Sequence, residues 1–155
     1  MRAFLDAVQA LPEDEFNVLY IKHNAGKHLR HVFDHVSAFL ESLHSGELDY
    51  DKRSRGSLCE VDCDVASALI DDLLCKLERA SLKNRPLKVL SEIDTDETVR
   101  HRFDSNTDRE LLYLINHTIH HAAHLQLLAK QCGIELPVDM GVSPATASFR
   151  RQSAC

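Results

Sequence analysis

Eight of the ten histidines lie in two short segments, HNAGKHLRHVFDH (23–35) and NHTIHHAAH (116–124). On a helix, residues four apart lie one turn apart on the same face, so His117 and His121 can reach one point in space. Two histidines at this spacing supply half of a metal site. His120 and His124 form a second such pair, turned slightly aside. The segment HTIHH lacks the glutamate that follows the first histidine in zinc metalloproteases, so that class of enzyme is not supported.

A metal ion needs further ligands, and the first segment offers them. His28, His31 and His35 lie beside an apolar stripe on their own helix, and any of the three can supply the third imidazole from across a helical bundle. Helical geometry does not choose among them. Three neutral imidazoles leave coordination positions open for water or for a substrate thiolate or oxygen, which is typical of catalytic sites. The alternative is a hydrogen-bonded polar seam without metal.

The rest of the composition narrows the class of protein. The chain has 155 residues and a formal net charge of -6, with basic and acidic residues intermixed, so neither nucleic acid nor a membrane surface is an expected partner. Within its first 16 residues, proline and acidic residues interrupt the apolar stretch too early for a signal peptide. We therefore expect a cytoplasmic location. The five cysteines are expected to be reduced thiols.

Apolar periodicity predicts helices over about 3–11, 25–43, 58–82 and 105–133, of which the third would begin with a capping box from Ser57 to Glu60. The segments RPLKVLSEI and ETVRHRFDS, separated by a short acidic stretch, predict a β-hairpin. We therefore expect an all-α protein, an antiparallel four-helix bundle with a small β-hairpin before the last helix. A single domain would span 1–146, and 147–155 would be a disordered tail.

The sequence resembles the DinB/YfiT-like family of metal-binding four-helix bundles. The likeness is carried by GKHLRHVFDH, by NHTIHHAAHL, by DRELLYLI before the latter, and by DMGVSPAT near the end. The resemblance implies a site for one divalent ion in which His31 joins His117 and His121, while His28 and His35 remain alternatives. It also implies a homodimer and, in some members, transfer of a low-molecular-weight thiol or hydrolysis.

Several other polar residues are candidates for roles near the metal. We expect His120 and His124 to act as acid or base, and His28, His35 or Glu110 to hydrogen-bond a ligand. Glu110 can equally stabilise the start of its helix. The segment DYDKRSR can bring Tyr50, Arg53 and Arg55 to the rim, where the two guanidinium groups could meet an anionic substrate; the alternative is a solvated, charge-balanced loop.

These residues favour a metal-dependent enzyme that activates a thiol or water toward a small electrophilic substrate. The alternative is a non-catalytic metal-binding module for stress response or sensing. Three imidazoles suit zinc, nickel, iron or manganese.

Overall fold

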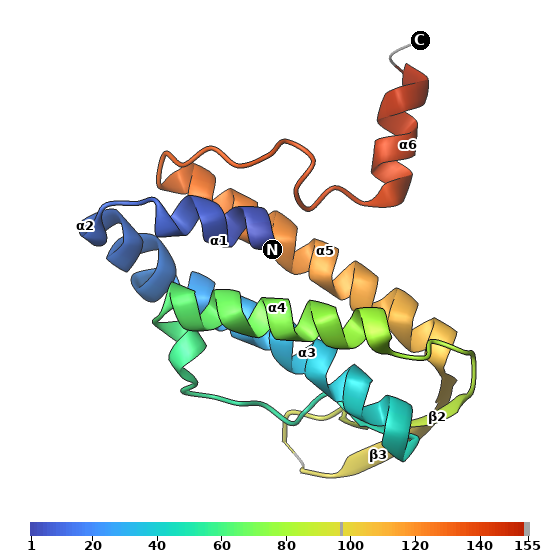
Figure 1. Ribbon diagram of the computed structural model, residues 1–155. Helices are drawn as coiled ribbons and strands as arrows, with labels where there is room; N and C mark the ends of the chain where they lie inside the picture. The colour runs from blue at the N-terminus through green and yellow to red at the C-terminus, as the bar shows by residue number, and fades with distance from the viewer. Residues whose placement is uncertain (97, 154–155) are drawn as a thin grey trace.

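The chain is described by a computed structural model that covers residues 1–96 and 98–153. Most of it is helical, and a small sheet lies at one end of the helices (Figure 1). The helices are α1 (Arg2–Gln9), α2 (Glu13–Phe16), α3 (Ala25–Ser45), α4 (Cys63–Arg79), α5 (Thr107–Gln131) and α6 (Pro144–Ser153), with a π-helical segment over Asn17–Lys22 and a 3-10 turn over Leu58–Glu60. The strands are β1 (Glu47–Asp49), β2 (Pro86–Glu92) and β3 (Arg100–Asn106).

Helix α3 is the central element of the fold, because it packs against both α4 and α5, while the short α1 packs on α4. Its apolar residues recur every three or four positions, so one wide stripe is buried. Leu29, Phe33 and Phe39 in this stripe are at most 2% exposed. This packing fixes the rotation of α3 about its axis and therefore decides which of its polar residues face α5.

The third predicted helix is interrupted near its start. A 3-10 turn covers Leu58–Glu60, and α4 begins only at Cys63. Asp62 caps α4, accepting hydrogen bonds from the backbone N–H groups of Asp64 at 2.8 Å and Val65 at 3.1 Å. The capping box expected from Ser57 is therefore not formed, because the side chain that satisfies the free N–H groups lies five residues later.

The predicted hairpin is present as β2 and β3, which pair antiparallel. A third strand, β1, was not predicted. It pairs parallel with β2, with Glu47 opposite Lys88. Three residues are too few to show the alternating pattern of a strand, and the pairing joins segments that are about forty residues apart in the chain.

The last predicted helix is confirmed as α5, and the side chain of Asn106 caps it by accepting from the Arg109 N–H at 3.0 Å. The tail from residue 147, expected to lack regular structure, belongs to α6 through Ser153 in the structure, and residues 154–155 lie outside the described part. Cys59, Cys63, Cys75 and Cys132, the described cysteines, are all free. None of the described helices is both long enough and apolar enough to cross a bilayer.

Candidate metal centre

Two helices place a row of six histidines face to face. We call this set the histidine row: His28, His31 and His35 of α3, and His117, His121 and His124 of α5. The spacings of three, four and seven residues keep each set on one face of its helix. Across the interface, Nε2 of His31 lies 3.2 Å from Nε2 of His117, and Nδ1 of His28 lies 3.3 Å from Nδ1 of His121.

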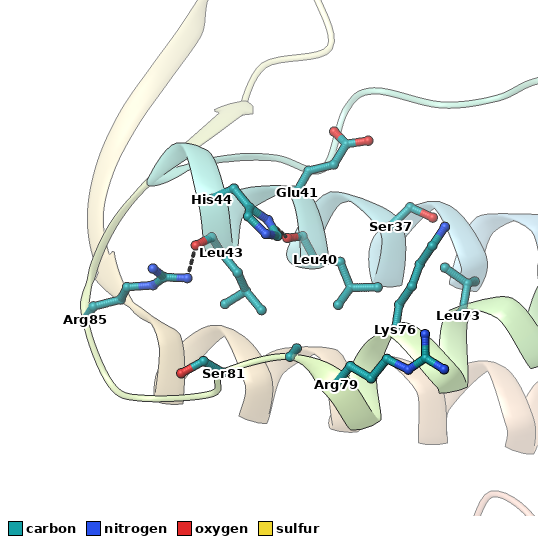
Figure 2. A pocket seen from close by; sticks show the side chains of 11 residues that line it. Ser37, Leu40, Glu41, Leu43, His44, Leu73, Lys76, Arg79, Ser81 and Arg85 are labelled. Carbon is teal, nitrogen blue, oxygen red and sulfur yellow. Dashed lines mark hydrogen bonds between the residues drawn. The ribbon is translucent and has the colours of Figure 1, made fainter.

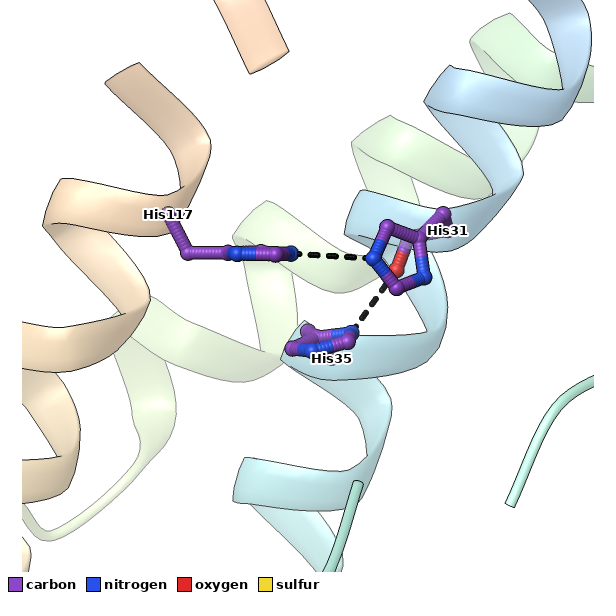
Figure 3. A group of neighbouring side chains, drawn as sticks. All are labelled: His31, His35 and His117. Atoms are coloured by element: carbon purple, nitrogen blue, oxygen red, sulfur yellow. Dashed lines mark hydrogen bonds between the residues drawn. The ribbon is translucent and has the colours of Figure 1, made fainter. Parts of the chain in front are cut away.

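One ring nitrogen from each of His31, His35 and His117 lies within 4.8 Å of the other two, a spacing at which they could hold a metal ion (Figure 3). Nδ1 of His35 donates to the carbonyl oxygen of His31 at 3.1 Å, which leaves Nε2 of His35 with a free lone pair. Bonds of 2.0–2.1 Å at tetrahedral angles place ligand nitrogens about 3.4 Å apart. The pair formed by His31 and His117 is already near this separation.

Ring orientation distinguishes a second set, His31, His117 and His121, which we call the ligand triad. A metal lies in the plane of each imidazole that binds it, because the lone pair lies in that plane. The three planes are steeply inclined to one another, at 70°, 74° and 77°, so no two of these rings are parallel. The planes of His35 and His117 are only 16° apart, with ring centroids 4.2 Å apart, and do not converge.

The ring distances of the triad also match a shared ion. Metal–nitrogen bonds of ordinary length and angles between 90° and tetrahedral put ring centroids about 4.5–5.2 Å apart. The three observed distances are 4.6, 4.9 and 5.0 Å. In the structure, Nδ1 of His121 is directed at His28. A rotation of the His121 ring by 180° about its Cβ–Cγ bond would exchange the nitrogen and carbon sides of the ring and would leave the ring plane unchanged.

The protonation state of the row suits metal ligation. Burial, followed by the neighbouring imidazoles, lowers the pKa of His31 and of His121 to about 3 and that of His117 to about 4. These imidazoles are therefore neutral at physiological pH, which is the form that binds a metal. Nδ1 of His31 is buried without a hydrogen-bond partner among the described residues. This nitrogen points away from His117, so it is the neutral Nε2 of His31, facing His117, that could bind a divalent ion shared by the two rings (Figure 3).

Comparison with known proteins gives the family of the chain. The model of the DinB family matches residues 1–147. The chain belongs to the DinB family. FK506-binding protein 5 of Rhizopus delemar is 32% identical over 101 residues, which are 64% of this chain and 26% of that protein, so the match spans about a quarter of the relative's length. No solved structure matches the chain.

In this DinB-family chain Glu110 lies beside the row but not in it. Its side chain is fully buried and accepts hydrogen bonds from the Tyr50 hydroxyl at 3.1 Å, from Arg109 at 2.7 Å and from the Ser105 hydroxyl. Among the described residues none of its hydrogen bonds goes to a histidine. The Tyr50 ring stacks on His35 at 4.7 Å, so Glu110 contacts the row through this tyrosine. Because β1 was not predicted from the sequence, the contact of Tyr50 with His35 was not predicted either.

The remaining predicted residues lie around the row. His120 is exposed at its edge with its ring 5.3 Å from that of His121, and the ring of His124 packs on that of His28 at 4.3 Å. Arg53 and Arg55 line a polar hollow of about 450 Å³ together with Asp51, Glu92 and Arg100. The charge of Arg53 contributes, after burial and the imidazoles, to the lowered pKa of His31 and His117, so this loop lies near the triad.

A buried ionic network behind the row was missed from the sequence. Arg30 is 8% exposed and pairs with Asp34 at 2.6 Å and with Glu60 at 2.8 Å. Asp34 also accepts a hydrogen bond from the backbone N–H of Ser54 at 3.2 Å, which anchors the loop that carries Arg53. The four-residue spacing from Arg30 to Asp34 was a readable signal for the first pair, whereas nothing local indicated Glu60.

Proposed function

We propose that this DinB-family protein binds one divalent metal ion through His31, His117 and His121 and is an enzyme that transfers a thiol to, or hydrolyses, a small electrophilic substrate. The observation that carries the proposal is the close approach of three non-parallel imidazoles from two helices, at ring distances that suit a common ion. The lowered pKa values, which keep the rings neutral, support it. Zinc, nickel, iron and manganese all suit three imidazoles.

The chemistry follows from the groups around the triad. A bound divalent ion would supply a Lewis acid that makes a thiol or water more acidic. His120, exposed at the edge of the row, would pass the released proton to solvent, and His124, whose ring packs on that of His28, would act as a further acid or base. The guanidinium groups of Arg53 and Arg55 would hold an anionic group on a low-molecular-weight thiol cosubstrate or on the electrophile.

The finer architecture is part of the same proposal. In a DinB-like four-helix bundle, the segment that includes α1 would provide the fourth side next to α3, α4 and α5. We also propose a homodimer, which the exposed apolar side chains Leu112 and Ile115 on α5 would favour. The free cysteines suit a reducing compartment such as the cytoplasm.

A second candidate is a metal-binding module without turnover, serving stress response or sensing. The match to FK506-binding protein 5 of Rhizopus delemar favours it, because the region similar to this chain is about a quarter of a longer protein. A module of this kind would change stability or partner binding when metal binds and would form no product.

Metal content of purified protein tests the ligand set. We expect one divalent ion per chain, lost in His31→Ala, His117→Ala and His121→Ala and retained in His101→Ala, which removes an exposed histidine on β3. His35→Ala decides between the two sets described above. Retention of metal in His35→Ala with loss in His121→Ala supports the ligand triad, and the reverse pattern assigns the third position to His35. Metal kept by all of these variants would refute the site.

Turnover separates the enzyme from the module. Consumption of thiol with a test electrophile such as chlorodinitrobenzene, followed with loaded and metal-stripped protein, should be metal-dependent. Arg53→Gln paired with Arg55→Gln should raise KM for a carboxylate-bearing thiol and leave KM for a neutral thiol unchanged. Metal binding that stabilises the protein without product formation would favour the module.

A further inference from the structure

A second hollow lies away from the histidine row. It opens between the C-terminal halves of α3 and α4 and the segment that leads to β2, and its volume is about 690 Å³ (Figure 2). This is within the range of small-molecule pockets, about 300–1,000 Å³. Its apolar lining residues are Leu40, Leu43, Leu73 and Ala80, and none of its lining residues belongs to the histidine row. The two sites therefore use different faces of α3.

The rim of this pocket is basic. His44, Lys76, Arg79 and Arg85 line it, against a single acidic residue, Glu41. Figure 2 shows the Glu41 carboxylate turned away from the leucine side chains. An anion placed on the leucines would therefore meet mostly positive charge.

The basic residues differ in how far they are already paired. Lys76 forms an exposed ion pair with Asp72 at 2.6 Å. Arg85 donates to the carbonyl oxygen of Leu43, which closes one end of the pocket (Figure 2). For Arg79, by contrast, the described part of the chain contains no ion pair. Its guanidinium is the group most able to accept a new anionic partner.

Stabilisation of helix ends explains only part of the basic charge at this rim. Basic residues in the last turn stabilise a helix, and His44, Lys76 and Arg79 all lie in such turns. Arg85 lies outside both helices, and stabilisation of a helix end does not require an open apolar floor between them. An apolar floor beneath a basic rim is complementary to a molecule with a hydrocarbon body and one acidic group.

We infer that this pocket binds a small amphipathic anion, a carboxylate on an alkyl or aryl body, with the body on Leu40 and Leu43 and the carboxylate at Arg79 and Lys76. The assignment is independent of the metal site. It gives the protein a second ligand, and the ligand class follows from the charge of the rim and the apolar floor.

Octanoate is a suitable probe, titrated into the full chain with leucine and isoleucine methyl groups labelled for NMR. Octanoate should shift the methyl signals of Leu40 and Leu43, which line this pocket and not the second groove, and octanol should bind there two- to fivefold more weakly, the ratio that corresponds to an exposed ionic contact of about 0.4–1 kcal/mol. A second groove, of about 490 Å³ and almost wholly apolar, includes Leu111 and Ile115 and serves as an internal control. Equal affinity for octanoate and octanol, or shifts confined to that second groove, would overturn the inference.

Two matched variants test the charge itself. Arg79→Gln should weaken octanoate two- to fivefold, leave octanol unchanged and leave metal content unchanged, whereas Arg150→Gln on α6, an exposed arginine outside the pocket, should alter neither ligand. Arg79→Lys should retain most of the affinity because it retains the charge. Unchanged octanoate affinity in Arg79→Gln, with only a lower melting temperature, would assign these residues to the helix end and refute the pocket.

Discussion

The hydrogen bond from Tyr50 to Glu110 gives a direct test of how much a buried polar contact beside the histidine row stabilises the fold. Glu110 is fully buried and Tyr50 is 9% exposed, so the 3.1 Å bond between hydroxyl and carboxylate is shielded from water. Tyr50→Phe removes this donor and keeps the ring that stacks on His35. The carboxylate then keeps only its bonds from Ser105 and Arg109.

The expected loss of stability follows from the kind of bond removed. Hydrogen bonds to charged groups contribute about 1.5–3 kcal/mol, and a buried acceptor that loses a donor cannot recover it from water. With a urea m-value of about 2 kcal/mol/M, the midpoint of unfolding should fall by about 1 M. Metal content should stay the same, because the imidazoles keep their positions.

Urea unfolding followed by circular dichroism measures this effect, with Tyr113→Phe as the matched control. Tyr113 also lies against the row, stacked on His117 at 5.6 Å, but its hydroxyl has no hydrogen bond among the described residues. The control should shift the midpoint by less than about 0.3 M. Equal midpoints for the wild type and Tyr50→Phe would refute the supporting role of this bond.

Three further predictions concern the pH dependence of the triad, the close packing at Gly26 and the cap of α4. Metal-stripped protein should lose stability as the pH falls from about 6.5 toward 4. The reason is that burial lowers the pKa values of the ligand triad in the folded state, so the unfolded chain binds more protons over this range. Urea unfolding at about pH 7.5 and at about pH 5 measures the loss. As a control, the metal-stripped His101→Ala variant should lose stability with falling pH as steeply as the wild type, because it keeps all three histidines of the triad. Gly26→Ala should cost about 1–3 kcal/mol in thermal unfolding, because its Cβ would lie 2.1 Å from the carbonyl oxygen of Glu60. Asp62→Ala should cost about 1 kcal/mol and Ser57→Ala much less; equal losses would contradict the observed cap.

Local sequence determined the helices and the histidine pairs. Apolar residues at helical spacing predicted α3 and α5 closely, because periodicity and caps act within a few residues. The pair of His117 and His121 depends only on helical rise and twist, so it too was readable. The start of α4 was placed too early, since two capping side chains, Ser57 and Asp62, competed within one short segment.

Only the tertiary structure decided how the pairs combine. The choice among the histidines of α3 depends on the rotation of that helix against α5, which is set by the packing of Leu29, Phe33 and Phe39 and not by any local spacing. The position of Tyr50 depends on the parallel pairing of β1 with β2, a contact across about forty residues. Sequence therefore determined which residues each helix could offer to a metal. Packing of separate elements decided which imidazoles of α3 and α5 face one another, because only the folded chain brings distant residues into a fixed orientation.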